Sequence, residues 1–157
     1  MSSAIIFEPL VRHRYLLPLV AEWFETEWPD WYGAEGQGNL QQDLQAYSAS
    51  AERLPVGMIA FERSHPVGAG ALKAESIPGH THLCPWAAAG YVVPSCRGRG
   101  IGAALLAGLV RHAETLGFER VFCATSTSES LLIRSGWSVV EVVQHAGKAL
   151  TIFRSAA

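Results

Sequence analysis

A glycine-rich turn between an apolar strand and a helix is the feature that most constrains the fold of this chain. Residues 92–109 read VVPSCRGRGIGAALLAGL, with glycines at 98, 100 and 102, two arginines among them, and an alanine- and leucine-rich run behind. A helix that begins there leaves backbone N–H groups without partners and carries partial positive charge. Glycines let an anion approach that backbone, and Arg97 and Arg99 add charged donors. The stretch therefore predicts a strand, a turn that binds an anion such as a diphosphate, and a helix.

Two common glycine-rich phosphate loops fit this stretch less well. A Walker loop needs lysine and then serine or threonine after its last glycine, and Ala103 and Ala104 stand there. The Rossmann fingerprint needs an acidic residue at the end of the next strand, whereas Glu119 precedes the strand expected at 120–124. A nicotinamide-dependent oxidoreductase is therefore disfavoured. A tight turn with solvated arginines stays open as the purely structural alternative.

The rest of the chain reads as a succession of short elements. Its 157 residues, 49% of them hydrophobic, suffice for one domain with a substantial core, so we expect a single domain over residues 1–157. Hydrophobic periodicity predicts helices at 13–28, 40–47, 100–116 and 128–134. It predicts strands at 4–7, 56–61, 67–73, 86–93, 120–124, 139–143 and 149–153. The order indicates a mixed α/β fold with hairpins at both ends.

Composition excludes several classes of partner. A net charge of −2 argues against nucleic acid, which selects a basic surface. No apolar run reaches membrane-spanning length, and the N-terminus does not resemble a secretory signal, so we expect a cytoplasmic protein without membrane contact. Cys84, Cys96 and Cys123 are odd in number and form no CxxC pair, which favours neither a disulfide framework nor a structural zinc site.

The glycine-rich turn resembles the signature of a known family. Residues 97–102, Arg-Gly-Arg-Gly-Ile-Gly, match the (Arg/Gln)-x-x-Gly-x-(Gly/Ala) pattern of the GNAT superfamily of N-acetyltransferases, and Val-x-Pro precedes them. The similarity extends through ALLAGLVRHAETLGFERVFCATS to LLIRSGW. It implies a twisted mixed sheet of about six to seven strands, largely antiparallel, with a central splayed parallel pair that parts near Val92, flanked by about four helices.

The resemblance also implies the activity. The donor would be acetyl-CoA, no metal would be needed, and the acceptor would be a primary amine of a small molecule or of a peptide N-terminus. Attack would be direct, in a ternary complex, and the protein could form a homodimer. A non-catalytic module that senses acyl-CoA is the alternative from another functional class.

By the same resemblance, the donor site can be placed residue by residue. Backbone N–H groups of the turn would hold the diphosphate, and the edge of the preceding strand would pair with pantetheine. The N–H of Tyr91 or Val92 would stabilise the thioester oxygen, and Thr125 stands where many members have an asparagine that binds the cofactor. The expected cofactor-binding residues are Tyr91, Val92, Val93, Arg97, Gly98, Arg99, Gly100, Ile101, Gly102, Ala103 and Thr125.

The chain departs from the family at its acid and its base. Leu132 stands where many members have a tyrosine that protonates the departing thiolate, and Trp86 and Ala88 replace a glutamate or histidine base. A base is still required, because an amine with a pKa of about 10 is mostly protonated at neutral pH. His82 is the catalytic candidate, acting through a water chain. A loop histidine, or a metal site of His80, His82 and Cys84, are the other interpretations.

The acceptor pocket is indicated by EWFETEWPDWYG, residues 22–33. Its aromatic residues alternate with Glu22, Glu25, Glu27 and Asp30, a combination that can receive a cation by stacking and charge. The alternative is a core helix with a solvated acidic face. The expected acceptor-binding residues are Trp28, Asp30, Trp31, Tyr32 and Trp86.

Overall fold

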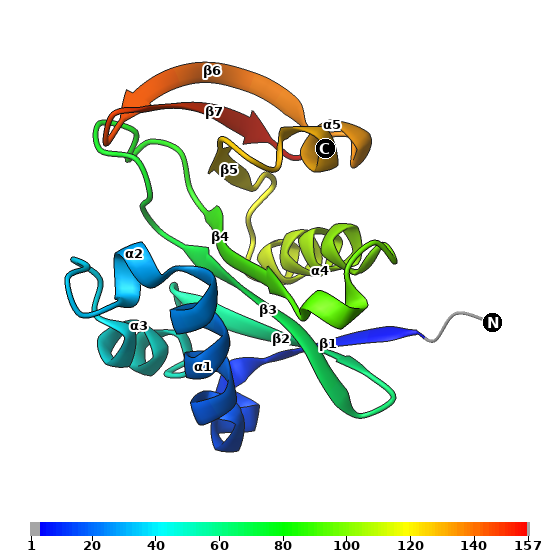
Figure 1. Ribbon diagram of the computed structural model, residues 1–157. Coiled ribbons are helices and arrows are strands. Elements are labelled where there is room, and N and C mark those ends of the chain that lie inside the picture. The colour runs from blue at the N-terminus through cyan, green and yellow to red at the C-terminus, as the bar shows by residue number, and fades with distance from the viewer. Residues whose placement is uncertain (1–3, 157) are drawn as a thin grey trace.

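The computed structural model describes residues 4–156, whose seven strands form one sheet in the order β1-β2-β3-β4-β5-β7-β6 (Figure 1). The strands are β1 (Ile5–Pro9), β2 (Val56–Glu62), β3 (His65–Lys73), β4 (Trp86–Val92), β5 (Phe122–Thr125), β6 (Ser138–His145) and β7 (Lys148–Arg154). Neighbouring strands are antiparallel except for the parallel pair of β4 and β5. The mixed sheet with a central parallel pair confirms the fold expected from the sequence.

Five α-helices flank the sheet within the described residues. They are α1 (Leu17–Glu27), α2 (Pro29–Tyr32), α3 (Leu40–Tyr47), α4 (Ile101–Thr115) and α5 (Glu129–Arg134), and two 3₁₀ segments, η1 (Leu10–Leu16) and η2 (Pro94–Cys96), complete the set. No helix among residues 4–156 combines the length and the apolar character needed to cross a membrane.

The expected helix at 13–28 is divided, and prolines explain where. Pro18 lies in the first turn of α1, the position where its missing N–H costs nothing, and the residues before it form η1. Trp28 precedes Pro29 and has φ −125° and ψ 62°, outside the helical region that a following proline disfavours. The chain therefore turns at Trp28, where the expected helix ends, and starts the short helix α2, for which the sequence shows no periodicity.

Two hairpins, β2–β3 and β6–β7, lie early and late in the chain, as the sequence predicted. The β2–β3 turn places Arg63 and Ser64 at φ 50° and 71°, and the β6–β7 turn places Ala146 and Gly147 at φ 51° and 79°. Two consecutive left-handed residues give the turn twist that matches paired antiparallel strands.

Helices cover both faces of the central strands. Trp23 and Phe24 of α1 pack with Leu44 of α3 on one face, while Leu109 and Ala113 of α4 belong to the cluster on the other. β2 and β3 are consequently buried almost throughout, which is why their sequences read as continuous apolar runs. β6, at the sheet edge, is mostly exposed.

Candidate functional site

β4 and β5 separate after a single pair of residues, and this separation opens the sheet (Figure 1). Trp86 lies opposite Phe122, whose N–H donates to the Pro85 carbonyl at 2.9 Å. Beyond that point β4 pairs with β3 while β5 pairs with β7. The two strands thus part already after Trp86, earlier than the expected position near Val92, and one edge of β4 is left open.

A β-bulge bends β4 along this open edge. Two residues of β4, Ala89 and Gly90, stand opposite a single residue of β3, Gly70. Ala89 adopts the left-handed region with φ 54°. A bulge re-aims the backbone locally, and such features are frequent beside binding sites. Nothing in the sequence indicates the bulge, because the strand reads as an unbroken run of small apolar residues.

The backbone of Val92 faces the opening. Nε of Arg97 donates to the Val92 carbonyl at 2.8 Å, whereas the N–H of Val93 donates across to Val67 of β3 at 2.9 Å. Successive residues of a strand turn their backbone groups to opposite sides. The Val92 N–H therefore points away from β3, and of the two donors expected for the thioester oxygen, Tyr91 and Val92, the geometry favours Val92.

Two cavities adjoin in the opening. The β4 cavity, about 420 Å³, is bounded by residues 87–92, by leucines of α4, by β5 and by the start of α5. The glycine-turn cavity, about 390 Å³, lies over residues 96–98 and the start of α4. Both are bounded by Glu27, Gly90, Tyr91, Val92, Gly102, Ser128 and Leu131. Because they share these walls, the two cavities lie side by side, and together they are called the groove below.

The glycine turn gives the second cavity its donors. Gly98 and Gly100 have φ 77° and 82°, and an added Cβ at either would meet no atom within 4 Å. The Ala104 N–H donates to the Gly100 carbonyl at 3.0 Å, so the N–H groups of the three residues between them precede the first intrahelical bond. All three residues line the cavity. The expected anion site at the start of α4 is therefore open to a ligand.

The arginines of the turn are placed differently from each other. Arg97 lines the glycine-turn cavity, and its Nη2 donates to Oε2 of Glu27 at 2.8 Å. Arg99 borders neither cavity, and its Nη2 donates to Oε2 of Glu62 at 2.6 Å. Arg134, the last residue of α5, lines the glycine-turn cavity instead. The sequence did not single it out, because its approach depends on how α5 packs beside α4.

Hydroxyl groups border the β4 cavity at the end of β5. The Thr125 hydroxyl oxygen accepts from the N–H groups of Thr127 at 3.2 Å and Ser128 at 3.0 Å. All three residues line the cavity. Thr125 thus fixes the turn that leads into α5, and its hydroxyl proton can still be donated to a ligand. Val93, by contrast, lines neither cavity.

At Leu132 and Cys123 the wall of the β4 cavity offers neither a tyrosine hydroxyl nor a thiolate. Leu132 lines it and is 1% exposed, so the place of the family's tyrosine is apolar here. Cys123 lines it as well, and burial raises the pKa of its thiol to about 11. At neutral pH this thiol is protonated and a poor nucleophile. The geometry therefore does not favour an acetylated cysteine.

His82 lies away from both cavities. It is exposed, and its ring stacks on that of His80 at a centroid distance of 5.9 Å. His80 contacts Glu141 of β6, and this hydrogen bond raises the His80 pKa. No group of three or more His, Cys, Asp or Glu side chains within residues 4–156 could hold a metal ion. The structure therefore adds no support for His82 as the base, nor for a metal at this pair.

Of the residues expected to bind the acceptor, one lines a cavity and the others do not. Trp28 lines the β4 cavity, but Asp30 and Trp31 are exposed and line neither cavity. The Tyr32 hydroxyl donates to Oδ2 of Asp43 at 2.6 Å, and burial raises its pKa. Trp86 is fully buried and its Nε1 donates to the Leu83 carbonyl at 2.8 Å, so it belongs to the core.

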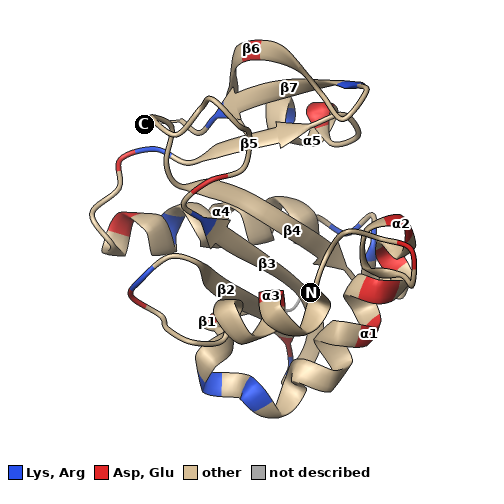
Figure 2. Cartoon of the chain, turned by 90° about the vertical axis from the view of Figure 1, so that its left-hand side faces the viewer, with Lys and Arg blue, Asp and Glu red and all other residues tan. Residues whose placement is uncertain are grey.

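Acidic residues nevertheless gather where the acceptor was expected. Figure 2 shows acidic residues on α1 and α2. Only Glu27, the last residue of α1, reaches the cavities, and it borders both of them. The sequence indicated an acidic segment there, but could not tell which carboxylate turns inward.

Comparison with known proteins agrees with this geometry. The family model described as Acetyltransferase (GNAT) family matches residues 18–132, which include β4, the glycine turn, α4 and β5. No curated protein sequence matches the chain.

Solved structures share the fold at low sequence identity. An aminoglycoside 6'-N-acetyltransferase complexed with coenzyme A superposes with a TM-score of 0.76 at 14% identity, covering 96% of each chain. The aminoglycoside 6'-N-acetyltransferase from Enterococcus faecium gives 0.74 at 15% identity, again over 96% of each chain. YncA from Salmonella typhimurium, solved with its cofactor acetyl-CoA, gives 0.71 at 16% identity over 98% of this chain and 93% of that chain.

Proposed function

Because the chain belongs to the GNAT family of acetyltransferases, which use acetyl-CoA and need no metal, we propose that it transfers an acetyl group to the nitrogen of a primary amine. The observation that carries this proposal is the groove at the splayed strands. One part of it presents helix N-terminal N–H groups without intrahelical partners, and the other presents an open strand edge. These are the features that a diphosphate and an amide-bearing arm require.

The residues along the groove match the successive parts of acetyl-CoA, the acetyl donor. N–H groups of residues 98–103 would hold the diphosphate, with Arg134 as a charged donor, while the Arg97 N–H stays bound to the Pro94 carbonyl. The open edge at Val92 would pair with the pantetheine amides as a further strand would, and the Thr125 hydroxyl would donate to the same arm. The role expected for Arg99 is not part of this arrangement, because Arg99 is bound to Glu62 outside the groove.

The acetyl transfer would then depend on how the thioester and the amine are positioned in the groove. The Val92 N–H would donate to the thioester oxygen, on which negative charge grows as the neutral amine attacks the carbonyl carbon. The C–S bond breaks, the amine loses its proton to water, and the thiolate takes one from water, because Leu132 offers none. A thiol with a pKa of about 8.5 is a fair leaving group, so this loss is tolerable.

The acceptor we propose is a cationic small molecule, with a peptide N-terminus as the other form. Trp28 offers an aromatic face and Glu27 a carboxylate at the groove, and further acids lie on α1 and α2. Two of the similar structures are aminoglycoside acetyltransferases, whose substrates are amines of this kind.

An assay of acetyl-CoA with an amine panel and free-thiol detection tests the proposal. The panel would contain 1,4-diaminobutane, benzylamine, an aminoglycoside and a short peptide. We expect release of CoA that depends on the amine, with kcat/KM rising with pH toward the amine's own pKa, because only the neutral amine attacks.

A second function is favoured by one observation. The β4 cavity lacks both the tyrosine and a histidine or carboxylate on β4, so the protein could bind acyl-CoA without turnover. Calorimetric binding of CoA together with no thiol release across the whole panel would support that sensor and contradict the enzyme.

A further inference from the structure

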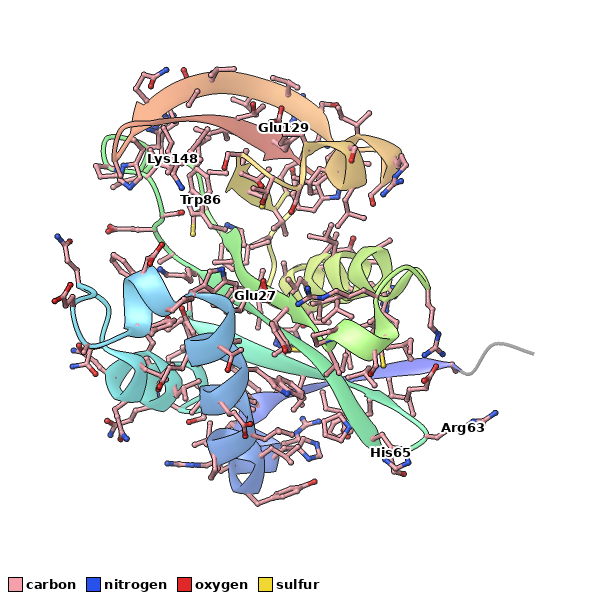
Figure 3. All side chains as sticks on the ribbon, viewed as in Figure 1. Glu27, Arg63, His65, Trp86, Glu129 and Lys148 are labelled. Atoms are coloured by element: carbon pink, nitrogen blue, oxygen red, sulfur yellow. The ribbon has the colours of Figure 1, made fainter. Side chains whose placement is uncertain are left out.

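Glu27 and Arg97 join the two cavities of the groove. Glu27 is the single carboxylate that lines either cavity in the part of the chain that the structure describes. Figure 3 places it at the end of α1, beside β4. Its carboxylate accepts from Nη2 of Arg97 at 2.8 Å, although the two residues are far apart in sequence. The ion pair thus spans the boundary between the diphosphate end and the β4 end of the groove.

The Arg97 side chain makes two hydrogen bonds and one contact with an aromatic ring. Each of these partners lies where a ligand would bind. Nε donates to the Val92 carbonyl at 2.8 Å, on the edge proposed for pantetheine. Nη2 donates to Glu27, the carboxylate that lines both cavities. The guanidinium carbon lies 5.5 Å from the centroid of the Tyr91 ring, which also lines both cavities. Arg97 therefore competes with the ligands of the proposed function for these groups.

A diphosphate would compete effectively for the same guanidinium. Arg97 lines the glycine-turn cavity, so its charged end needs only to rotate toward that cavity. Arginine binds phosphate oxygens in a bidentate manner, and such contacts are stronger than an exposed ion pair with a carboxylate. The Arg97 and Glu27 side chains are 48% and 33% exposed, so their present pairing is of the weak class.

We propose that Arg97 is a latch between the two substrates: it occupies the Val92 carbonyl and Glu27 until the diphosphate of CoA draws it away, and Glu27 then binds the ammonium group of the acceptor. This proposal rests on the proposed function. Release of Arg97 frees the edge carbonyl for pantetheine and leaves a carboxylate without its cation beside Trp28. The two binding events are coupled, and by linkage the amine strengthens CoA binding by the same factor.

Glu27→Gln tests the latch through CoA binding alone. The substitution keeps the size of the side chain and removes its charge, so the ion pair that holds Arg97 away from the diphosphate position is lost. We expect calorimetry to show CoA binding about three- to tenfold tighter than in the parent protein, the range of a modest coupling energy. In an Arg97→Ala background the same substitution should change CoA affinity by less than about twofold, because no latch remains.

Glu129→Gln is the matched control. Glu129 precedes cavity-lining residues in α5, lines neither cavity, and accepts from Thr151 at 3.2 Å (Figure 3). Its loss of charge should leave CoA affinity as in the parent. Tightening by Glu129→Gln, or tightening by Glu27→Gln that persists without Arg97, would show a general charge effect and overturn the latch, as would a Glu27→Gln variant that binds CoA like the parent.

The role of Glu27 in binding the acceptor is tested by steady-state kinetics with 1,4-diaminobutane, one amine of which can stay protonated while the other attacks. Glu27→Gln should raise the amine KM about tenfold or more and change kcat less, because an ammonium-binding contact is lost. An unchanged amine KM would overturn the assignment of Glu27. Failure of the proposed function would look different: the parent itself would not bind CoA, or would release no thiol with any amine.

Discussion

The two ends of the groove bind their ligands with different groups, backbone N–H groups at one end and side chains at the other. The diphosphate end uses backbone N–H groups of consecutive residues at one glycine turn. The acceptor end uses side chains from α1, β4, β5 and α5, which meet only in the folded sheet. A binding site made of backbone N–H groups can be predicted from residues adjacent in the sequence. A site made of side chains depends on which residues point into the cavity in the folded protein.

Gly100→Glu should abolish CoA binding, with a loss of at least about 100-fold. Gly100 has φ 82°, where a non-glycine residue costs roughly 1–2 kcal/mol, and the new carboxylate would stand at the diphosphate position. Isothermal calorimetry measures the affinity, and thermal unfolding shows whether the variant folds.

Gly79→Glu controls for backbone strain. Gly79 has φ 81° and lies in the loop before β4, away from both cavities. It should share the loss of stability and keep CoA affinity. Equal CoA affinity of a folded Gly100→Glu protein would remove the backbone site from the account.

Trp28→Ala and Trp31→Ala should separate the cavity wall from its surroundings. Trp28 lines the β4 cavity, whereas Trp31 is 50% exposed and packs over Gly38. We expect the amine KM to rise about tenfold for Trp28→Ala and less than about twofold for Trp31→Ala. Steady-state kinetics at saturating acetyl-CoA measures both, and the reverse ranking would place the acceptor outside the cavity.

Arg134→Ala should weaken CoA binding more than Arg99→Ala. Arg134 borders the glycine-turn cavity, while Arg99 is held by Glu62. The expected losses are about three- to tenfold for Arg134→Ala and less than about twofold for Arg99→Ala, since the backbone donors remain in both. A larger loss for Arg99→Ala would mean that the signature arginine leaves Glu62 to bind the ligand.

The Cys123 thiol should stay unreactive at neutral pH. Burial raises its pKa to about 11, so only about 0.1% is thiolate at pH 8, and the thiolate fraction should rise about tenfold per pH unit up to pH 10. Iodoacetamide labelling followed by peptide mass spectrometry measures this slope. Rapid labelling at pH 7, or an acetylated Cys123 after incubation with acetyl-CoA, would contradict direct transfer.

The sequence predicted the fold through signals that are local. The glycine turn, the strand before it and the helix after it are set by residues adjacent in the chain, and the hairpin at Arg63 and Ser64 follows from its polar turn. The end of the first helix at Trp28 was predicted, because Pro29 follows it directly. The short helix α2 beyond Pro29 was not predicted, because four residues are too few to show a hydrophobic periodicity.

The acceptor end could not be predicted at the same level. Trp31 and Asp30 look like pocket residues beside Trp28, but the turn at Trp28 carries them outward. Trp86 appears on a strand next to the site, yet its ring enters the core. The contact of Glu27 with Arg97 joins α1 to the glycine turn and has no signal in the sequence. In each case the role of the residue depends on where its side chain points, and only the tertiary packing determines that.

A crystal structure of the protein with CoA tests the central claim most directly. The account predicts diphosphate oxygens within hydrogen-bonding distance of the N–H groups between Gly98 and Ala103, and a pantetheine arm paired with the open edge of β4 at Val92. Diphosphate bound outside the glycine turn, or a pantetheine arm that leaves the opening between β4 and β5 free, would contradict it.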